Sequence, residues 1–192
     1  MQELKERIRK EGKVLPGNII KVDGFLNHRI DTELMDHIAE EFGKHFNMDE
    51  VTMILTAEAS GIARAAIVAQ HFHKPMIFAK KAKSDNIEGG LYQSDIFSYT
   101  YKKKVTLLVS KEWMSADDKV LIIDDFMANG EAMRGLCDIV EAAGATLVGI
   151  GCAVEKGFQG GGDRLRAAGV NLHSLAIIES AEPGNIVFRD EN

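Results

Sequence analysis

The sequence has few cysteines, prolines and aromatic residues, and these shortages exclude several classes of protein. Its 192 residues include 2 Cys, 3 Pro and 1 Trp. Two cysteines are too few for the disulfide framework of a small secreted domain. Cys137 and Cys152 fall in a predicted helix and a predicted strand, where a free thiol behaves as a small buried hydrophobe. We therefore expect both thiols to be free and the protein to be cytoplasmic.

Long apolar runs and an excess of basic residues are also missing. Residues 1–8 mix charged and apolar side chains at helical spacing and lack the apolar centre of a signal peptide. No stretch approaches the length of a membrane span. The formal net charge is -6, from 29 acidic and 23 basic residues, whereas a nucleic-acid surface needs a basic stripe. We expect neither nucleic acid nor membrane as a partner.

What the sequence does contain is a globular composition, with 45% hydrophobic and 27% charged residues. Helical patterns are predicted at residues 1–11, 31–46, 61–70, 131–143 and 163–168. Strand patterns are predicted at residues 19–22, 53–55, 76–79, 120–123, 146–154 and 172–178, with an extended piece at 186–188 and a hairpin over 95–109. This alternation predicts an α/β fold with a doubly wound, mostly parallel sheet and helices on both faces.

The most informative segment is residues 120–132. Four aliphatic residues read as a central strand, and Asp124 and Asp125 follow at its carboxyl end, the edge where open α/β sheets bind ligands. Two neighbouring carboxylates, which we expect at an exposed strand end, can accept hydrogen bonds from the vicinal hydroxyls of a ribose. The motif loop, residues 128–132, has small residues and opens a helix near Glu131, so its N–H groups suit a phosphate. A solvated strand end and an ordinary Asn-Gly turn explain parts of this pattern.

Two further segments should lie at the same sheet edge. The second loop, residues 56–62, connects a predicted strand to a predicted helix and contains Ala59, Ser60 and Gly61. Ordinary helix capping is the alternative interpretation. Lys80 and Lys81 leave the carboxyl end of strand 76–79, where they either attract an anion as point charges or lie in solvent.

At these residues the chain resembles the type I phosphoribosyltransferases, whose signature is an aliphatic strand, two acids and a phosphate loop. Asn129 stands where the signature usually has Thr, and the Asn-Gly pair is similar to the xanthine-specific branch of the family. The resemblance covers almost the whole chain. It includes residues 25–28, 58–63, 80–81 and 154–159.

The resemblance implies the type I phosphoribosyltransferase fold and a purine salvage reaction. Xanthine and 5-phospho-α-D-ribose 1-diphosphate would give xanthosine 5'-monophosphate and diphosphate, with Mg²⁺ accompanying the diphosphate and no metal held by a set of protein ligands. It also implies a homodimer. We expect one domain, 1–192, with a core of about 31–180 and a hood from 1–30 and 181–192, and a mobile loop, 83–95, over the site.

The resemblance assigns roles residue by residue. Asp124 and Asp125 are the catalytic acids. The phosphoribosyl group is held by Ala128, Asn129, Gly130, Glu131 and Ala132. The leaving pyrophosphate is held by Ala59, Ser60, Gly61, Lys80 and Lys81, with a non-proline cis peptide at Ala59–Ser60. Xanthine is held by Ile20, Asn27 and Lys156.

Some details favour xanthine over other purines. Lys156 suits an oxo or anionic purine, and Phe158 is a candidate to stack on it. Hypoxanthine-guanine relatives carry an Asp where this chain has Ala128, so no acid there assists the base, and xanthine could react as its anion.

Glycines 160–162 suit a flexible connector or, less well, a phosphate loop.

Two rival functions stay open at this point. One is a phosphoribosyltransferase for guanine, hypoxanthine or adenine. The other is a non-catalytic regulator that binds the sugar diphosphate, although such proteins carry a DNA-binding domain and we expect only about thirty residues before the first core helix of this acidic chain.

Overall fold

The computed structural model describes residues 1–81, 90–98 and 103–189. The helices are α1 (Gln2–Glu11), α2 (Thr32–His45), α3 (Ser60–His71), α4 (Glu131–Ala142) and α5 (Gly161–Ala167), with a π-helical turn at Asp23–Asn27 and a 3-10 turn at Gly157–Gln159. The strands are β1 (Lys13–Leu15), β2 (Ile19–Lys21), β3 (Met53–Ala57), β4 (Met76–Ala79), β5 (Leu91–Ser98), β6 (Lys103–Ser110), β7 (Lys119–Met127), β8 (Thr146–Lys156), β9 (Leu172–Glu182) and β10 (Asn185–Phe188).

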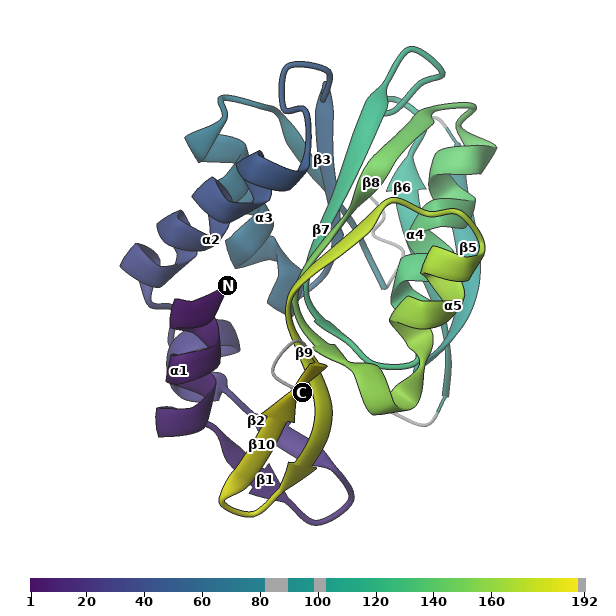
Figure 1. Cartoon of the computed structure of the whole chain (residues 1–192). Helices are drawn as coiled ribbons and strands as arrows, with labels where there is room; N and C mark the ends of the chain where they lie inside the picture. The colour runs from purple at the N-terminus through teal and green to yellow at the C-terminus, as the bar shows by residue number, and fades with distance from the viewer. Residues whose placement is uncertain (82–89, 99–102, 190–192) are drawn as a thin grey trace.

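A six-stranded sheet forms the centre of the molecule (Figure 1). Its strand order is β10-β9-β8-β7-β3-β4, with β10 antiparallel to β9 and all other neighbours parallel. This confirms the predicted doubly wound, mostly parallel sheet. Parallel neighbours bring the carboxyl ends of β3, β4, β7 and β8 to one edge, which is where the predicted site residues begin.

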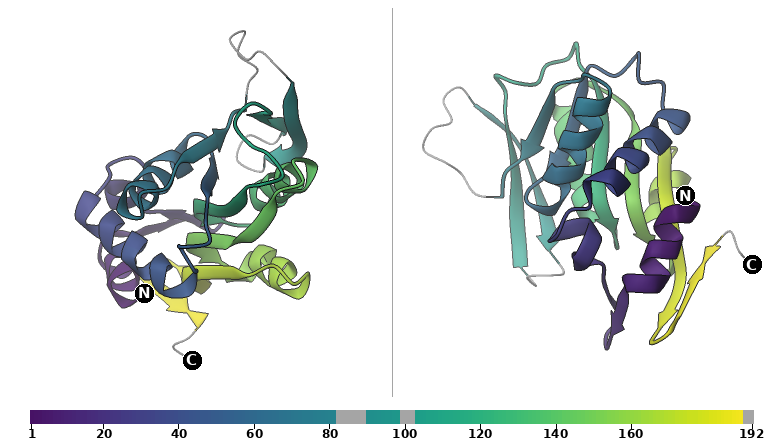
Figure 2. Two further views of the ribbon diagram at one scale, coloured as in Figure 1. Left: turned by 90° about the horizontal axis from the view of Figure 1, so that it is seen from above. Right: turned by 90° about the vertical axis from the view of Figure 1, so that its left-hand side faces the viewer.

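Strand β7 is buried on both faces of the sheet. Its alternate side chains point to opposite faces and join two different hydrophobic cores. Leu121 and Ile123 join the core under α1, α2 and α3, whereas Val120 and Ile122 join the core under α4 and the β5–β6 hairpin. The view from above in Figure 2 shows α2 and α3 on one side of the sheet and α4 and α5 on the other. A strand packed on both faces needs apolar residues at every position, as the sequence 120–123 has.

Helix α2 illustrates how local sequence sets an element. The Asp31 carboxylate accepts a hydrogen bond from the Leu34 N–H at 3.2 Å, which satisfies a free donor of the first turn. Leu34, Ile38 and Phe42 recur on one face and are all buried. The predicted cap and apolar face are both confirmed.

The β5–β6 hairpin is a separate two-stranded antiparallel sheet at one edge of the molecule (Figure 2, right). A bridge between Lys80 and Leu108 connects it to the end of β4. The predicted hairpin is confirmed, but β5 already begins at Leu91. The predicted mobile loop at 83–95 therefore overlaps β5, and its residues 83–89 lie outside the described residues.

Segments from the two ends of the chain gather at the lower end of the molecule in Figure 1. Helix α1 buries Leu4 and Ile8 completely, and the Met1 ammonium group donates to the Leu175 carbonyl at 2.6 Å. The boundary between a core at 31–180 and a hood stays a prediction.

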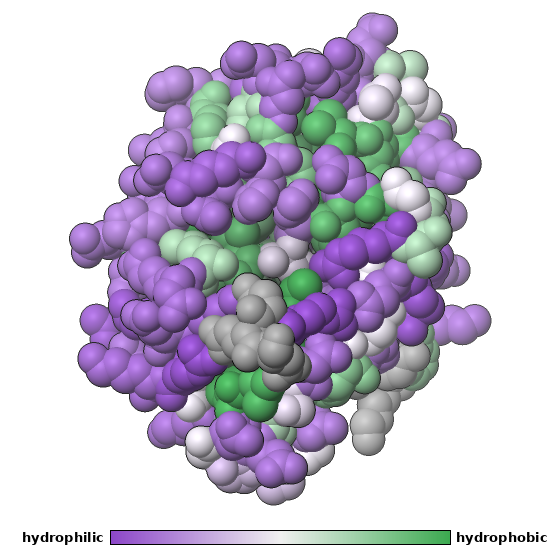
Figure 3. Space-filling view, in the orientation of Figure 1, coloured by the Kyte–Doolittle hydropathy of each residue, from purple (hydrophilic) through white to green (hydrophobic). Residues whose placement is uncertain are grey.

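The surface seen in Figure 3 is largely hydrophilic, with separate hydrophobic areas between the charged side chains. None of the helices in the described part of the chain is both long and apolar enough to cross a membrane.

Candidate active site

A cavity of about 520 Å³ lies at the carboxyl ends of β3 and β7, beside the start of α4. Its lining residues are Ile20, Asn27, Ala57, Glu58, Ser60, Lys81, Ile96, Phe97, Val105, Asp124, Asp125, Phe126, Met127, Ala128, Asn129, Gly130, Glu131, Ala132, Met133 and Lys156. Most of the predicted site residues therefore meet in one cavity. Ala59, Gly61 and Lys80 are not part of its lining.

The two acids are more enclosed than predicted. Strand β7 continues to Met127, so Asp124 and Asp125 lie within the strand, and they are only 6% and 4% exposed. The expectation of an exposed strand end is wrong. The reason is that the second loop and α3 cover β7 at this point.

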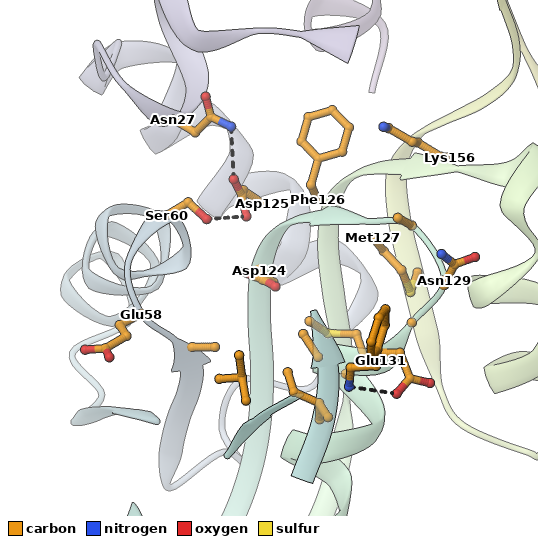
Figure 4. Close-up of a pocket in the computed structure, with 18 of the residues that line it drawn as sticks. Asn27, Glu58, Ser60, Asp124, Asp125, Phe126, Met127, Asn129, Glu131 and Lys156 are labelled. Carbon is orange, nitrogen blue, oxygen red and sulfur yellow. Dashed lines mark hydrogen bonds between the residues drawn. The ribbon is translucent and has the colours of Figure 1, made fainter. Parts of the chain in front are cut away.

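Asp125 is held by three protein groups, of which Figure 4 shows Ser60 and Asn27. Its carboxylate accepts hydrogen bonds from the Ser60 hydroxyl at 3.0 Å and the Asn27 amide at 3.2 Å. The Arg64 guanidinium lies 3.2 Å from the same carboxylate. Asn27 and Ser60 were predicted to contact ligands, and here both also orient an acid.

Asp124 lies against the start of α3. Burial, followed by repulsion from Asp125, raises the pKa of its carboxyl well above the ordinary value, and the positive charge of Arg64 opposes this rise. A side chain on Gly61 would place a Cβ atom 2.5 Å from the Asp124 Oδ1 atom. Gly61 therefore leaves space for the carboxylate instead of lining the cavity.

The motif loop packs against Gly161, the middle residue of the glycine run 160–162. Gly130 has a φ of +79°, a left-handed conformation that glycine adopts without strain, and it precedes α4 as predicted. A Cβ on Gly161 would come within 2.6 Å of the Gly130 nitrogen, so the absence of that atom lets α5 approach the loop. Arg164 adds a hydrogen bond to the Asn129 carbonyl at 3.0 Å. Gly161 thus packs against the motif loop, and residues 160–162 are not part of the cavity lining.

The second loop contains a non-proline cis peptide bond between Glu58 and Ala59. The predicted position, Ala59–Ser60, is wrong by one peptide. The Glu58 carboxylate accepts a hydrogen bond from the Lys81 N–H at 2.5 Å, which joins this loop to the end of β4. The Lys80 backbone exchanges two hydrogen bonds of 2.9 Å with Leu108, and this pairing anchors the β5–β6 hairpin.

An apolar and basic wall closes the opposite side of the cavity. The Lys156 ammonium group lies 5.7 Å from the centre of the Phe126 ring and donates to the Asn18 carbonyl at 3.1 Å. Burial lowers the pKa of Lys156. Ile20 completes the wall. Phe158 does not border the cavity, whereas Phe126 does and lies beside Lys156, so Phe126 is the aromatic side chain on this wall that a planar ligand would meet.

The residue before Lys156 has a structural role. Glu155 is completely buried and accepts hydrogen bonds from Arg166 at 2.6 and 3.1 Å and from the Ser174 hydroxyl. A buried carboxylate needs such partners. This ion pair fixes the end of β8 and thereby the position of Lys156.

Sequence reasoning missed several residues of this site, among them Phe126 and Arg64. Phe126 was visible as the aromatic residue directly after the acids. Arg64 was visible as the single charged residue in the small, apolar stretch 61–69. Within the described residues, no three His, Cys, Asp or Glu side chains gather as a metal site.

The sequence pattern described as "Phosphoribosyl transferase domain" matches residues 25–166, which include both acids, the motif loop and the second loop. This chain belongs to the phosphoribosyltransferase family. The predicted family and its type I fold are confirmed.

Curated relatives of this phosphoribosyltransferase match it from end to end. A protein of Bifidobacterium animalis subsp. lactis, named xanthine phosphoribosyltransferase, is 54% identical over 192 residues and aligns across 98% of this chain and 100% of its own length. A protein of the same name from Lachnoclostridium phytofermentans is 53% identical, with 100% of both chains aligned.

Solved structures share the fold at much lower identity. The APRTase from Giardia lamblia, complexed with 9-deazaadenine, has a TM-score of 0.76 at 20% identity and covers 90% of this chain and 96% of its own. The adenine phosphoribosyltransferase from Saccharomyces cerevisiae has a TM-score of 0.74 at 17% identity, covering 91% and 99%. At these identities the likeness concerns the fold alone.

Proposed function

We propose that this phosphoribosyltransferase acts on xanthine. It joins N9 of xanthine to C1 of 5-phospho-α-D-ribose 1-diphosphate and releases diphosphate, giving xanthosine 5'-monophosphate. The observation that carries this proposal is the 54% identity, over the full chain, to a relative named xanthine phosphoribosyltransferase. The lining of the cavity supports it.

The reaction needs no protein nucleophile. The C1–O bond to the diphosphate breaks, the C1–N9 bond forms on the opposite face with inversion, and the transition state resembles a ribosyl oxocarbenium ion. Asp124 and Asp125 accept hydrogen bonds from the ribose hydroxyls and lie near the positive charge that develops on the ribose. The amides of residues 128–132 hold the 5'-phosphate at the start of α4. Orientation and electrostatic stabilisation are thus the main contributions of the protein.

The leaving diphosphate is received by the second loop and Lys81. Both border the cavity, and the positive charge of Lys81 favours the anion. Carboxylates of Asp124, Asp125 and Glu58 border the same cavity and are oxygen donors of the kind that Mg²⁺ prefers, directly or through water. When bound with the diphosphate, Mg²⁺ would neutralise charge on the leaving group.

Lys156, Asn27 and Ile20 select the purine, with Phe126 against its ring. The ammonium group of Lys156 favours a purine that carries an oxygen or a negative charge. Ala128 supplies no acid or base, which suits xanthine reacting as its anion. The neutral base then loses one proton to solvent, and N9 of the resulting anion forms the bond to C1.

The homodimer and the compartment also belong to this proposal. Cys137 and Cys152 are free thiols in the structure, in keeping with the reducing cytoplasm. For the oligomer we predict that sedimentation velocity at micromolar concentration gives a species of twice the chain mass of 21.1 kDa. A species of 21.1 kDa alone would refute the dimer.

Initial rates with four purines test the function. With saturating sugar diphosphate and Mg²⁺, xanthine should give the highest kcat/KM among xanthine, guanine, hypoxanthine and adenine. A higher value for another purine would change the assigned base and leave the family intact. Absence of turnover with all four would favour the non-catalytic regulator.

A further inference from the structure

Arg64 is a buried charge beside the active site that the reaction scheme does not use. It lies on the second turn of α3, and its side chain is fully buried although it carries a guanidinium group. Burial lowers the pKa of Arg64, and Asp125 and Asp124 oppose that effect. Burying such a charge is costly unless its hydrogen bonds are satisfied.

The guanidinium group connects three parts of the site. Its Nη1 atom donates to the Leu26 carbonyl at 2.5 Å, and its Nη2 atom donates to the Ser60 carbonyl at 2.6 Å. The Nη2 atom also lies 3.2 Å from the Asp125 carboxylate. Leu26 belongs to the π-helical turn at Asp23–Asn27, Ser60 lies in the second loop as the first residue of α3, and Asp125 is on β7.

Each of these contacts involves a residue that lines the cavity or directly precedes one that does. Leu26 directly precedes Asn27, whose amide donates to Asp125 and borders the purine side. Ser60 has its carbonyl held by Arg64 while its hydroxyl donates to Asp125. The planar guanidinium is suited to hold several oxygens in fixed directions, whereas a lysine ammonium is a point charge.

We propose that Arg64 is a positioning residue that sets Asn27, the second loop and Asp125 in one arrangement, so that purine selection and binding of the sugar diphosphate depend on the same side chain. This inference rests on the proposed function. Arg64 itself does not border the cavity, so its effect passes through the residues it holds.

Two readouts separate positioning from simple stabilisation. In Arg64→Met, the Leu26 and Ser60 carbonyls lose their donor. KM for the sugar diphosphate should therefore rise at least about tenfold, and the ratio of kcat/KM for xanthine over hypoxanthine should fall about tenfold, since a lost polar contact is what relaxes selectivity. A merely destabilising substitution lowers the amount of active enzyme and leaves both KM and the ratio unchanged.

Val68→Ala is the matched control, because Val68 is a fully buried residue one turn later on α3 and does not border the cavity. It should keep the parent KM and base ratio. Arg64→Lys retains the charge without the planar donor set, and we expect it to restore less than half of the lost selectivity on a logarithmic scale. The Arg64→Met and Asn27→Ala substitutions should be non-additive in the base ratio.

The outcomes are distinct. A parent enzyme without xanthine activity would refute the proposed function. An active parent whose Arg64→Met variant keeps both KM and the base ratio would refute the positioning role alone. If Arg64→Met does not fold, Arg64→Lys is judged by the same two readouts, and if neither folds, Arg64 is a structural residue and the proposal is wrong.

Discussion

At the scale of single residues, the central feature is a pair of adjacent carboxylates kept in a nearly buried environment. Asp125 has Ser60, Asn27 and Arg64 as partners, whereas Asp124 faces Asp125 and the open side of Gly61. Two like charges at a buried site disfavour each other's ionised form. The ionised form of Asp125 is thus stabilised by its three partners, whereas burial of the ionised Asp124 lowers the stability of the fold.

We predict that Asp124→Asn removes activity and stabilises the fold. Turnover should fall on the order of 10²-fold, as when one preorganised electrostatic group is lost. The pKa of Asp124 is raised in the folded chain, so the folded parent binds this proton more tightly than the unfolded chain, and its stability decreases as pH rises from the ordinary value of 3.8 through the folded pKa.

The stability gain of Asp124→Asn should therefore be largest at alkaline pH and should shrink as the pH approaches 4. Urea unfolding of both proteins across this range measures it. A variant that is less stable than the parent at pH 8 would contradict the stated burial cost.

We further predict that Lys156→Ala harms xanthine more than hypoxanthine. Loss of a charged contact in a partly closed site costs about 2 kcal/mol, or roughly 30-fold in kcat/KM. Because burial lowers the pKa of Lys156, the ammonium form is lost at lower pH than in a free lysine. Activity with xanthine should then decline on the alkaline side earlier than activity with hypoxanthine, which a pH series of kcat/KM would detect. Equal losses on both bases would show that Lys156 does not read the purine.

At the scale of elements, loops from distant parts of the sequence depend on each other. The motif loop at the end of β7 is packed against the start of α5, and Arg164 holds the Asn129 carbonyl. The second loop is tied to the end of β4 through Glu58 and Lys81. Each loop is thus positioned by the neighbouring βα unit.

We predict that Gly161→Ala weakens binding of the sugar diphosphate by about tenfold or more, because its Cβ would lie 2.6 Å from the Gly130 nitrogen and must displace the motif loop. Calorimetry with the substrate and Mg²⁺ measures the affinity. Gly24→Ala is the control, since a Cβ there meets nothing within 4 Å and Gly24 does not border the cavity. Unchanged affinity in Gly161→Ala would mean that the loop does not need this close contact.

At the scale of the whole molecule, the sheet separates two hydrophobic cores, and segments from both ends of the chain close one of them. Ile8 of α1 and Phe188 of β10 belong to the same core as Phe42 of α2. Arg189 pairs with Asp163 and Glu179. Helix α1 and residues 185–189 are therefore part of the folded unit.

We predict that Ile8→Ala lowers the free energy of unfolding by about 2–4 kcal/mol, the usual cost of truncating a buried isoleucine. Ile19→Ala is the matched control, because Ile19 is 51% exposed, and it should cost less than about 0.5 kcal/mol. Urea unfolding compares the two. Similar values for both variants would show that α1 contributes little to the core.

Much of this arrangement could be predicted from local sequence. The apolar run at 120–123, the Asp31 cap and the strand at 76–79 depend on periodicity and capping, which act over a few residues. The resemblance to the phosphoribosyltransferases then assigned the acids, the motif loop and the purine residues. These assignments depended on short motifs, and Asn27, Lys156 and the motif loop do meet in one cavity.

Tertiary structure alone decided how those residues serve one another. The burial of Asp124 and Asp125, the roles of Gly61 and Gly161 as spacers, and the choice of Phe126 over Phe158 all depend on contacts between residues far apart in the chain. Arg64 is the clearest case, because its partners Leu26 and Asp125 lie 38 and 61 residues away in the sequence. Sequence periodicity shows which face a side chain occupies, but only the packing of the folded chain sets which charge it meets there.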